Sequence, residues 1–152
     1  MPVVYIDLPS GLSTASKTRL VREATAALHE AYPIPDTRVY LRDWSQESVG
    51  IDGDLAAPFR PICNYVVPPG LPAEAKRRLV ARVSTALGEA CGLPQHNIPL
   101  PSGRTVSTRW VLSFFNEYPL DRAALDGLMA FENPMVTESM EASMQAPGAA
   151  HS

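Results

Sequence analysis

The feature that most constrains the fold of this chain is an internal repeat. When residues 2–35 are shifted by 59 positions onto residues 61–94, thirteen of the thirty-four positions are identical without a gap. A repeat of this kind indicates that one supersecondary unit has been duplicated. The identical pairs are Pro2 with Pro61, Pro9 with Pro68, Gly11-Leu12 with Gly70-Leu71, Lys17 with Lys76, Arg19-Leu20-Val21 with Arg78-Leu79-Val80, Ala27-Leu28 with Ala86-Leu87, Glu30-Ala31 with Glu89-Ala90, and Pro35 with Pro94.

Each copy has the pattern of a strand followed by an amphipathic helix. Residues 2–8 and 61–67 are rich in β-branched and aromatic side chains and end at Pro/Gly turns. The helices that follow each have one apolar face, formed by Leu20, Ala24, Ala27, Leu28 and Ala31 in the first copy and by Leu79, Val83, Ala86, Leu87 and Ala90 in the second. Residues 38–42 then alternate like a half-buried strand, and a helix between two strands of one sheet implies that these strands are parallel. We therefore expect an α/β fold in which two fused strand-helix-strand units form a four-stranded sheet backed by two helices.

The length of 152 residues fits one domain. We place this domain at residues 1–136, with the first unit at 2–56 and the second at 61–136. The second copy departs from the first after Pro94, where an inserted loop at 95–107 precedes a strand at 109–115. Residues 137–152 are rich in Ser, Ala, Met and Glu and predict a flexible C-terminal tail.

The composition excludes several classes of function. A net charge of -3 without a basic block argues against binding to nucleic acid. The sequence has no apolar run of membrane-spanning length and no signal peptide, so we expect a cytoplasmic protein that does not bind a membrane. Cys63 and Cys91 are too few for a disulfide framework and lack metal-ligand spacing, so we expect reduced cysteines and no metal.

The start of the chain carries its most unusual chemical group. Pro2 follows the initiator Met1, and a methionine before so small a residue is normally removed, which would leave a free secondary amine on Pro2. A proline has no side-chain flexibility to lose, so this amine can act as a general base or a nucleophile in fixed geometry. Pro61 matches Pro2 in the repeat, but its nitrogen is an amide and cannot be a base. We therefore expect one working proline per chain.

Two segments carry a resemblance to a known family. Residues 38–56 contain an Arg-Val strand, an acidic residue and a Gly-Ile-x-Gly hairpin that leads to Leu-Ala, and residues 115–119 form a Phe-x-Glu-x-Pro segment. With Pro2 behind Met1 and the turn at Gly11, the first copy resembles the 4-oxalocrotonate tautomerase family. The duplication, the length and the Phe-x-Glu-x-Pro segment are similar to the fused members of the tautomerase superfamily, especially the cis-3-chloroacrylic acid dehalogenase group.

The resemblance implies a cofactor-independent isomerase that acts on a small molecule, an enol or an α,β-unsaturated carbonyl compound, and that forms a homotrimer. Pro2 would be its general base. Arg38 stands where the family places the arginine that draws electron density toward the substrate's carbonyl or carboxylate. Two alternatives stay open at this point. In the first, Pro2 serves a hydratase, decarboxylase, dehalogenase or biosynthetic enzyme of the same superfamily. In the second, the fold is a non-catalytic binding or assembly scaffold.

The second copy allows two alignments, which differ in the partner of Arg38. In one, Arg109 begins the strand that corresponds to the strand of Arg38, and it would serve the Pro2 site from across the sheet or from another subunit. In the other, Glu117 matches Asp43 and Leu112 lies opposite Arg38. Glu117 is a candidate for positioning a water or acting as a second acid.

Several apolar residues are candidates for lining the substrate site. Leu12 stands where the family has a second arginine, and the paired arginines of the dehalogenase group are missing from residues 68–71. With Trp44, Val49 and Phe115, Leu12 would give an apolar lining that suits a less charged substrate than a dicarboxylate. Dehalogenation of a haloacrylate is therefore disfavoured.

Overall fold

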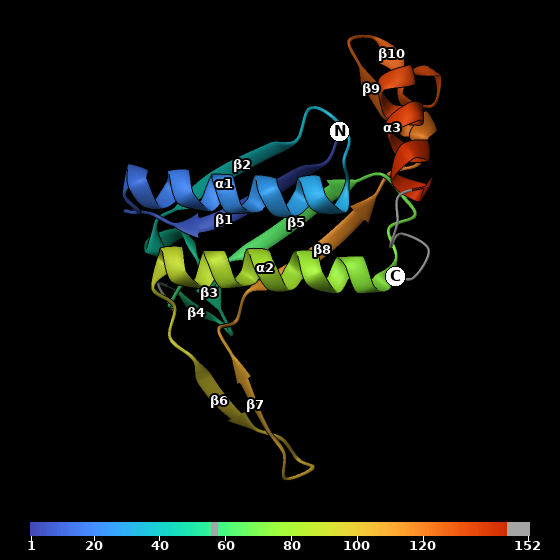
Figure 1. Ribbon diagram of the computed structural model, residues 1–152. Coiled ribbons are helices and arrows are strands. Elements are labelled where there is room, and N and C mark those ends of the chain that lie inside the picture. The colour runs from blue at the N-terminus through green and yellow to red at the C-terminus, as the bar shows by residue number, and fades with distance from the viewer. Residues whose placement is uncertain (56–57, 146–152) are drawn as a thin grey trace.

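The computed structural model of the protein describes residues 1–55 and 58–145 (Figure 1). Its main sheet has four strands in the order β2-β1-β5-β8. The strands are β1 (Val3–Pro9), β2 (Arg38–Trp44), β5 (Ile62–Val67) and β8 (Leu112–Glu117). Within each unit the strands are parallel, as β1 with β2 and β5 with β8, and the two units join through the antiparallel pair of β1 and β5. The predicted α/β fold of two strand-helix-strand units is confirmed.

Two helices, α1 (Thr14–Ala31) and α2 (Ala73–Cys91), cover one face of this sheet (Figure 1). Helix α1 begins at an N-cap serine, because the side chain of Ser13 accepts a hydrogen bond of 3.1 Å from the backbone N–H of Ser16. Helix α2 follows Pro72 and ends at Gly92, whose φ of 61° is the left-handed conformation that closes many helices.

The core lies between the sheet and the two helices. Alternate side chains of β1 and β5 point toward the helices and meet their apolar faces. The buried members are Val4, Ile6, Leu8, Cys63, Tyr65 and Val67 from the strands and Leu20, Ala24, Ala27, Leu28, Leu79, Val83 and Leu87 from the helices. The helix faces predicted from the sequence therefore form the core that holds the strands in place.

Both units end in a small hairpin. Strands β3 (Gly50–Ile51) and β4 (Asp54–Leu55) follow a 3₁₀ turn, η1 (Gln46–Ser48), and strands β9 (Ala124–Leu125) and β10 (Leu128–Met129) follow η2 (Leu120–Arg122). The turns match in conformation, since Asp52 and Asp126 both have a φ of 53°. The duplication therefore extends past the region in which the sequence identity is visible.

The last strand of the sheet differs from the prediction. The sequence predicted a strand at 109–115, whereas β8 runs from Leu112 to Glu117. The cause is Trp110, whose φ of 62° lies in the left-handed region and cannot continue an extended strand. In the register, Leu112 pairs with Ile62 as Arg38 pairs with Val3. Leu112, and not Arg109, is thus the equivalent of Arg38, and Glu117 is the equivalent of Asp43.

The insertion in the second unit is more regular than the predicted loop at 95–107. It contains a hairpin of β6 (His96–Pro99) and β7 (Thr105–Thr108), which projects from the body of the molecule (Figure 1).

The C-terminal segment forms a small lobe beside the N-terminus (Figure 1). After β10 the chain continues through η3 (Ala130–Glu132) into α3 (Pro134–Gln145). Residues 137–145 are thus helical where the sequence predicted a flexible tail, and residues 146–152 lie outside the described part. Met1 packs against Ala130 and Val136, which makes a second, smaller core.

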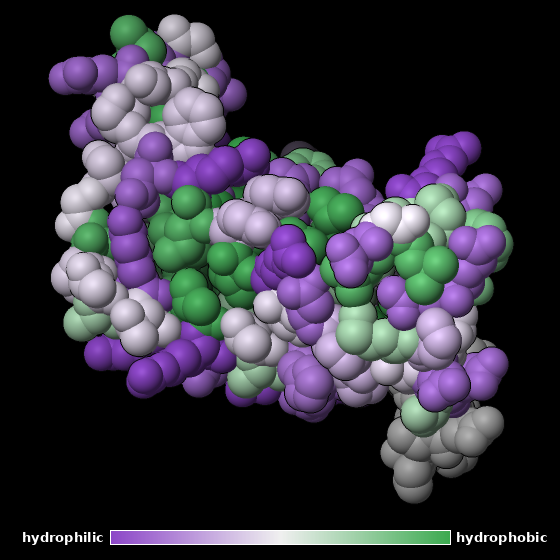
Figure 2. Space-filling view, turned by 90° about the horizontal axis from the view of Figure 1, so that it is seen from above, coloured by the Kyte–Doolittle hydropathy of each residue, from purple (hydrophilic) through white to green (hydrophobic). Residues whose placement is uncertain are grey.

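The face of the sheet opposite to the helices, here called the open face, carries exposed apolar side chains. Tyr40, Trp44, Leu112 and Phe114 are between 42% and 51% exposed. Viewed from above, hydrophobic residues are visible in several places between hydrophilic ones, so apolar residues are not confined to the core (Figure 2). Within the described residues, no helix is long and apolar enough to cross a membrane.

Candidate active site

The start of β1 places Pro2 inside the protein. Pro2 is fully buried, and its carbonyl oxygen accepts a hydrogen bond of 3.0 Å from the backbone N–H of Arg38. Because β5 is antiparallel to β1 and parallel to β8, the start of β1 lies at the same end of the sheet as the ends of β5 and β8. We call this the Pro2 end of the sheet, marked by Pro2, Arg38, Val67 and Glu117.

Burial at the Pro2 end changes the chemistry of the amino terminus. It lowers the pKa of the Met1 amino group to about 6, while the negative charge of Asp36 acts in the opposite direction and raises this pKa. A terminal amine here can therefore stay unprotonated at neutral pH, which a general base requires.

The guanidinium of Arg38, whose backbone N–H binds Pro2, is held by Asp36. Its Nε donates to both carboxylate oxygens of Asp36 at 3.0 Å, and its Nη2 lies 2.8 Å from one of them. This hydrogen bonding lowers the pKa of Asp36. The Arg38 side chain is 48% exposed, so the pair is open to solvent and to a ligand.

Two tyrosines and a glutamate complete the Pro2 end. The hydroxyl of Tyr118 donates a hydrogen bond of 3.0 Å to the carbonyl of Met1, and burial raises the pKa of Tyr118 to about 12. Tyr32, at the C-terminus of α1, is buried, and its hydroxyl has no hydrogen-bond partner among the described residues. Burial and the nearby Glu117 and Tyr118 raise the pKa of Tyr32. Glu117 itself forms an ion pair with Lys76 of α2.

These two tyrosines were not predicted as site residues. Tyr118 directly follows Glu117 in the Phe-x-Glu-x-Pro segment, and that position is a signal that could have suggested it. Tyr32 follows the apolar face of the first helix by one residue, which gives no sign that its hydroxyl lies near Glu117.

Four predicted site residues lie at the opposite end of the sheet. Leu12 is in the turn after β1, Trp44 ends β2, Val49 follows η1, and Arg109 precedes β8. Since a strand rises by about 3.3 Å per residue, the six residues of β8 separate Arg109 from the Pro2 end by roughly 20 Å. A single chain places Pro2, Arg38 and Glu117 at one end of the sheet, with Arg38 and Glu117 on the opposite edge strands β2 and β8, and it does not bring these four residues to that end.

Two of the predicted site residues, Phe115 and Arg109, make packing contacts within the fold. The ring of Phe115 stacks on that of Tyr65 with the ring centroids 4.7 Å apart, and this contact belongs to the core. Arg109 packs on Gly88 of α2 so closely that a Cβ atom on Gly88 would clash with its Nη1. Gly88 therefore leaves the space in which Arg109 lies.

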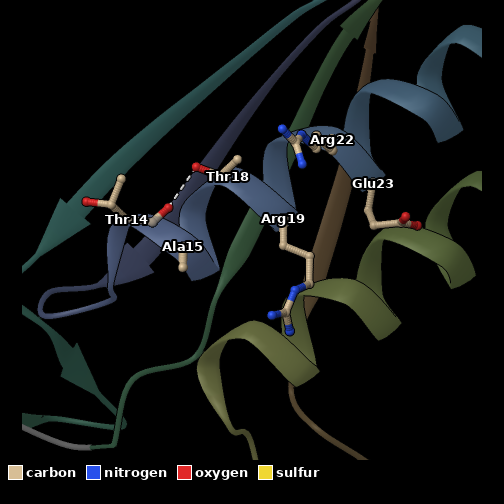
Figure 3. Close-up of a pocket in the computed structure, with 6 residues that line it drawn as sticks. All are labelled: Thr14, Ala15, Thr18, Arg19, Arg22 and Glu23. Carbon is tan, nitrogen blue, oxygen red and sulfur yellow. Dashed lines mark hydrogen bonds between the residues drawn. The ribbon is translucent and has the colours of Figure 1, made fainter.

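A shallow hollow on the first half of α1 is separate from the Pro2 end. It is lined by Thr14, Ala15, Thr18, Arg19, Arg22 and Glu23 (Figure 3). The hydroxyl of Thr18 donates to the carbonyl of Thr14 at 2.8 Å, which is a contact within one helix. No group of three or more His, Cys, Asp or Glu residues in the described ranges could hold a metal ion.

Among known proteins, the chain matches solved structures but no family model and no curated protein. A fused 4-OT protein, Q0, which is a symmetric trimer, superposes with a TM-score of 0.70 at 19% identity, covering 86% of this chain and 97% of its own. Pt0534, in a form inactivated by 2-oxo-3-pentynoate, gives a TM-score of 0.61 at 21% identity over 84% of this chain and 94% of its own.

A third similar structure comes from the dehalogenase group. N1, a member of the cis-3-chloroacrylic acid dehalogenase (cis-CaaD) family, gives a TM-score of 0.66 at 14% identity and covers 97% of this chain and 94% of its own. All three proteins match this chain along nearly their whole length. The chain therefore has the tautomerase superfamily fold, in the fused form that joins two strand-helix-strand units.

Proposed function

We propose that this chain is a cofactor-independent tautomerase whose general base is the secondary amine of Pro2, freed by the removal of Met1. The observation that carries this proposal is the full burial of Pro2 at the start of β1, in a place where burial lowers the pKa of an amine. The substrate is an enol or an α,β-unsaturated carbonyl compound, such as the enol of a keto acid.

The reaction moves one proton and needs no oxidant or reductant. The Pro2 nitrogen accepts the proton of the enol hydroxyl, the oxygen becomes a carbonyl as the electrons of the carbon–carbon double bond shift, and the carbon takes a proton back from the Pro2 ammonium. Charge develops on the oxygen during this transfer. Arg38 and the Tyr118 hydroxyl are the donors at the Pro2 end that can stabilise it.

A homotrimer is part of the proposal. The open face of the sheet leaves Tyr40, Leu112 and Phe114 exposed, and exposed apolar patches mark interaction surfaces. Q0, one of the structural neighbours, is a trimer. An assembly could also bring Leu12, Trp44, Val49 and Arg109 of one subunit toward Pro2 of another, which a single chain does not do.

Ketonisation of phenylenolpyruvate, followed by its ultraviolet absorbance, tests the proposal. The variant Pro2→Ala still loses Met1 but has a primary amine on a less rigid backbone, and we expect kcat/KM to fall by roughly 100-fold or more. Pro61→Ala is the matched control, because Pro61 is the equivalent buried proline at the start of β5 and has an amide nitrogen. It should keep kcat/KM within a few-fold of the parent if thermal melting shows a folded protein.

Two outcomes would contradict the proposal. Equal rates for the parent and Pro2→Ala would remove Pro2 from the mechanism. An intact mass that includes Met1 would show that Pro2 is an amide, and this result would favour the binding or assembly scaffold.

A further inference from the structure

Met1 is buried to an extent that is unusual for the first residue of a chain. It is 8% exposed and packs against Ala130 and Val136, which are both fully buried. Partly buried apolar residues of the same C-terminal lobe surround this group, and they are Leu120, Ala123, Leu125 and Met140. The protein therefore holds an apolar space the size of a methionine side chain directly beside the Pro2 nitrogen.

The backbone carbonyl of Met1 is also held by a hydrogen bond. Its carbonyl carbon is bonded to the Pro2 nitrogen, and its carbonyl oxygen accepts a hydrogen bond of 3.0 Å from the Tyr118 hydroxyl. Because burial raises the pKa of Tyr118 to about 12, this group stays a phenol and a hydrogen-bond donor at neutral pH. Met1 thus presents at the Pro2 nitrogen a carbonyl group with an unbranched apolar chain attached.

We propose that the substrate takes the place of Met1 in the processed protein, an inference that rests on the proposed function. The carbonyl or enol oxygen of the substrate accepts the hydrogen bond of Tyr118. Its substituent lies between Ala130 and Val136. The substrate class is then a 2-keto acid, or its enol, with an unbranched alkyl or an aryl group on C3. A second carboxylate on that substituent would be buried among apolar side chains, which disfavours a dicarboxylate.

Exchange of the C3 hydrogens of keto acids in D₂O, measured by NMR, tests this assignment. Pyruvate, 2-oxohexanoate and phenylpyruvate share the reacting atoms and differ in the substituent. After subtraction of the uncatalysed rate, we expect the parent to act on the two longer acids at least 10-fold faster than on pyruvate in kcat/KM.

The substitution Ala130→Leu fills part of the space that Met1 occupied. We expect it to lower kcat/KM for 2-oxohexanoate and phenylpyruvate by about 10-fold and to leave pyruvate within about twofold. The matched control is Ala124→Leu, the same change at an exposed position of the same lobe, and it should leave all three rates unchanged. Val136→Ala enlarges the space and should favour phenylpyruvate over 2-oxohexanoate, which keeps the test valid if Ala130→Leu does not fold.

The donor is tested separately from the apolar space. Tyr118→Phe should slow the exchange of all three acids by a similar factor, roughly 10-fold or more, because the carbonyl is common to them. A readout without turnover is thermal melting, in which phenylpyruvate should raise the Tm of the parent and not that of Ala130→Leu.

The two levels of the proposal fail in different ways. If exchange depends on Pro2 but is indifferent to the substituent, or if Ala130→Leu slows all three acids equally, the assignment of the Met1 space is wrong and the proposed function stands. If no acid shows exchange that Pro2→Ala abolishes, the proposed function fails and this inference fails with it.

Discussion

Two opposing effects set the pKa of the terminal amine, and a substitution at one residue, Asp36, removes one of them. Burial lowers the pKa of the terminal amine, and the carboxylate of Asp36 raises it. With Asp36→Asn the raising effect is lost and the positive charge of Arg38 is no longer balanced by its partner, so the pKa of the amine falls further. Since the unprotonated amine is the proposed base, the acid limb of the profile of kcat/KM against pH should move to lower pH.

The control for this prediction is Asp52→Asn, at another aspartate with a positive φ, which within one chain lies at the end of the sheet opposite to Pro2. Both substitutions keep a residue type that tolerates the left-handed backbone, so neither should strain the fold. The interpretation would be wrong if the acid limb of Asp36→Asn stayed in place or moved to higher pH.

At the residue scale the sequence could predict part of the site. Pro2 and Arg38 begin the two strands of one unit, and their proximity follows from the parallel pairing that the repeat implies. Tyr118 comes from the other unit and reaches Met1 only because β1 and β5 are antiparallel neighbours. The repeat does not specify how the two units meet, and for this reason Tyr118 could not be placed.

Each unit has an equivalent ion pair between a lysine of its helix and an acidic residue near the end of its last strand. The two ion pairs lie in different surroundings. Lys17 of α1 pairs with Asp43 of β2, and Lys76 of α2 pairs with Glu117 of β8. All four side chains are 29% to 43% exposed, so each pair should contribute no more than about 1 kcal/mol to stability. Only the second pair lies at the Pro2 end.

This difference gives a matched prediction. Lys17→Gln and Lys76→Gln should destabilise the protein equally little, by less than about 1 kcal/mol in denaturant unfolding. Lys76→Gln should in addition lower kcat/KM several-fold, because Glu117 loses the partner that holds it beside Tyr32 and Tyr118. Equal activity of the two variants would show that the ion pair of Lys76 with Glu117 has no role in the reaction.

At the scale of elements, periodicity predicted the helices and the first strands well. Their apolar faces recur at helical or alternating spacing, and burial follows that spacing directly. The prediction failed where one backbone angle or a local pairing decides the structure. The left-handed Trp110 shifts the start of β8, and the hairpin of β6 and β7 is stabilised by its own pairing rather than by an apolar pattern.

The whole molecule has one face of its sheet covered and one face open. The helices and the sheet bury a continuous core, whereas the open face keeps large side chains of β2 and β8 in solvent. This asymmetry could be foreseen in part, because two helices in a two-unit chain lie on the same side of the sheet. The identity of the exposed residues depends on the register of β8, and the sequence left that register ambiguous.

Phe114 tests whether this face holds the subunits together. If the open face is the interface of a homotrimer, the parent should sediment at three times the 16.5 kDa of one chain, and Phe114→Glu should sediment as a monomer because a charge would be buried in the interface. Phe131→Glu is a matched control, since Phe131 is equally exposed, at 51%, and lies on the C-terminal lobe. The control should stay trimeric.

Phe114→Glu should also lose activity if residues such as Trp44 or Arg109 reach Pro2 from a neighbouring subunit. A fully active monomer would show instead that one chain holds a complete site.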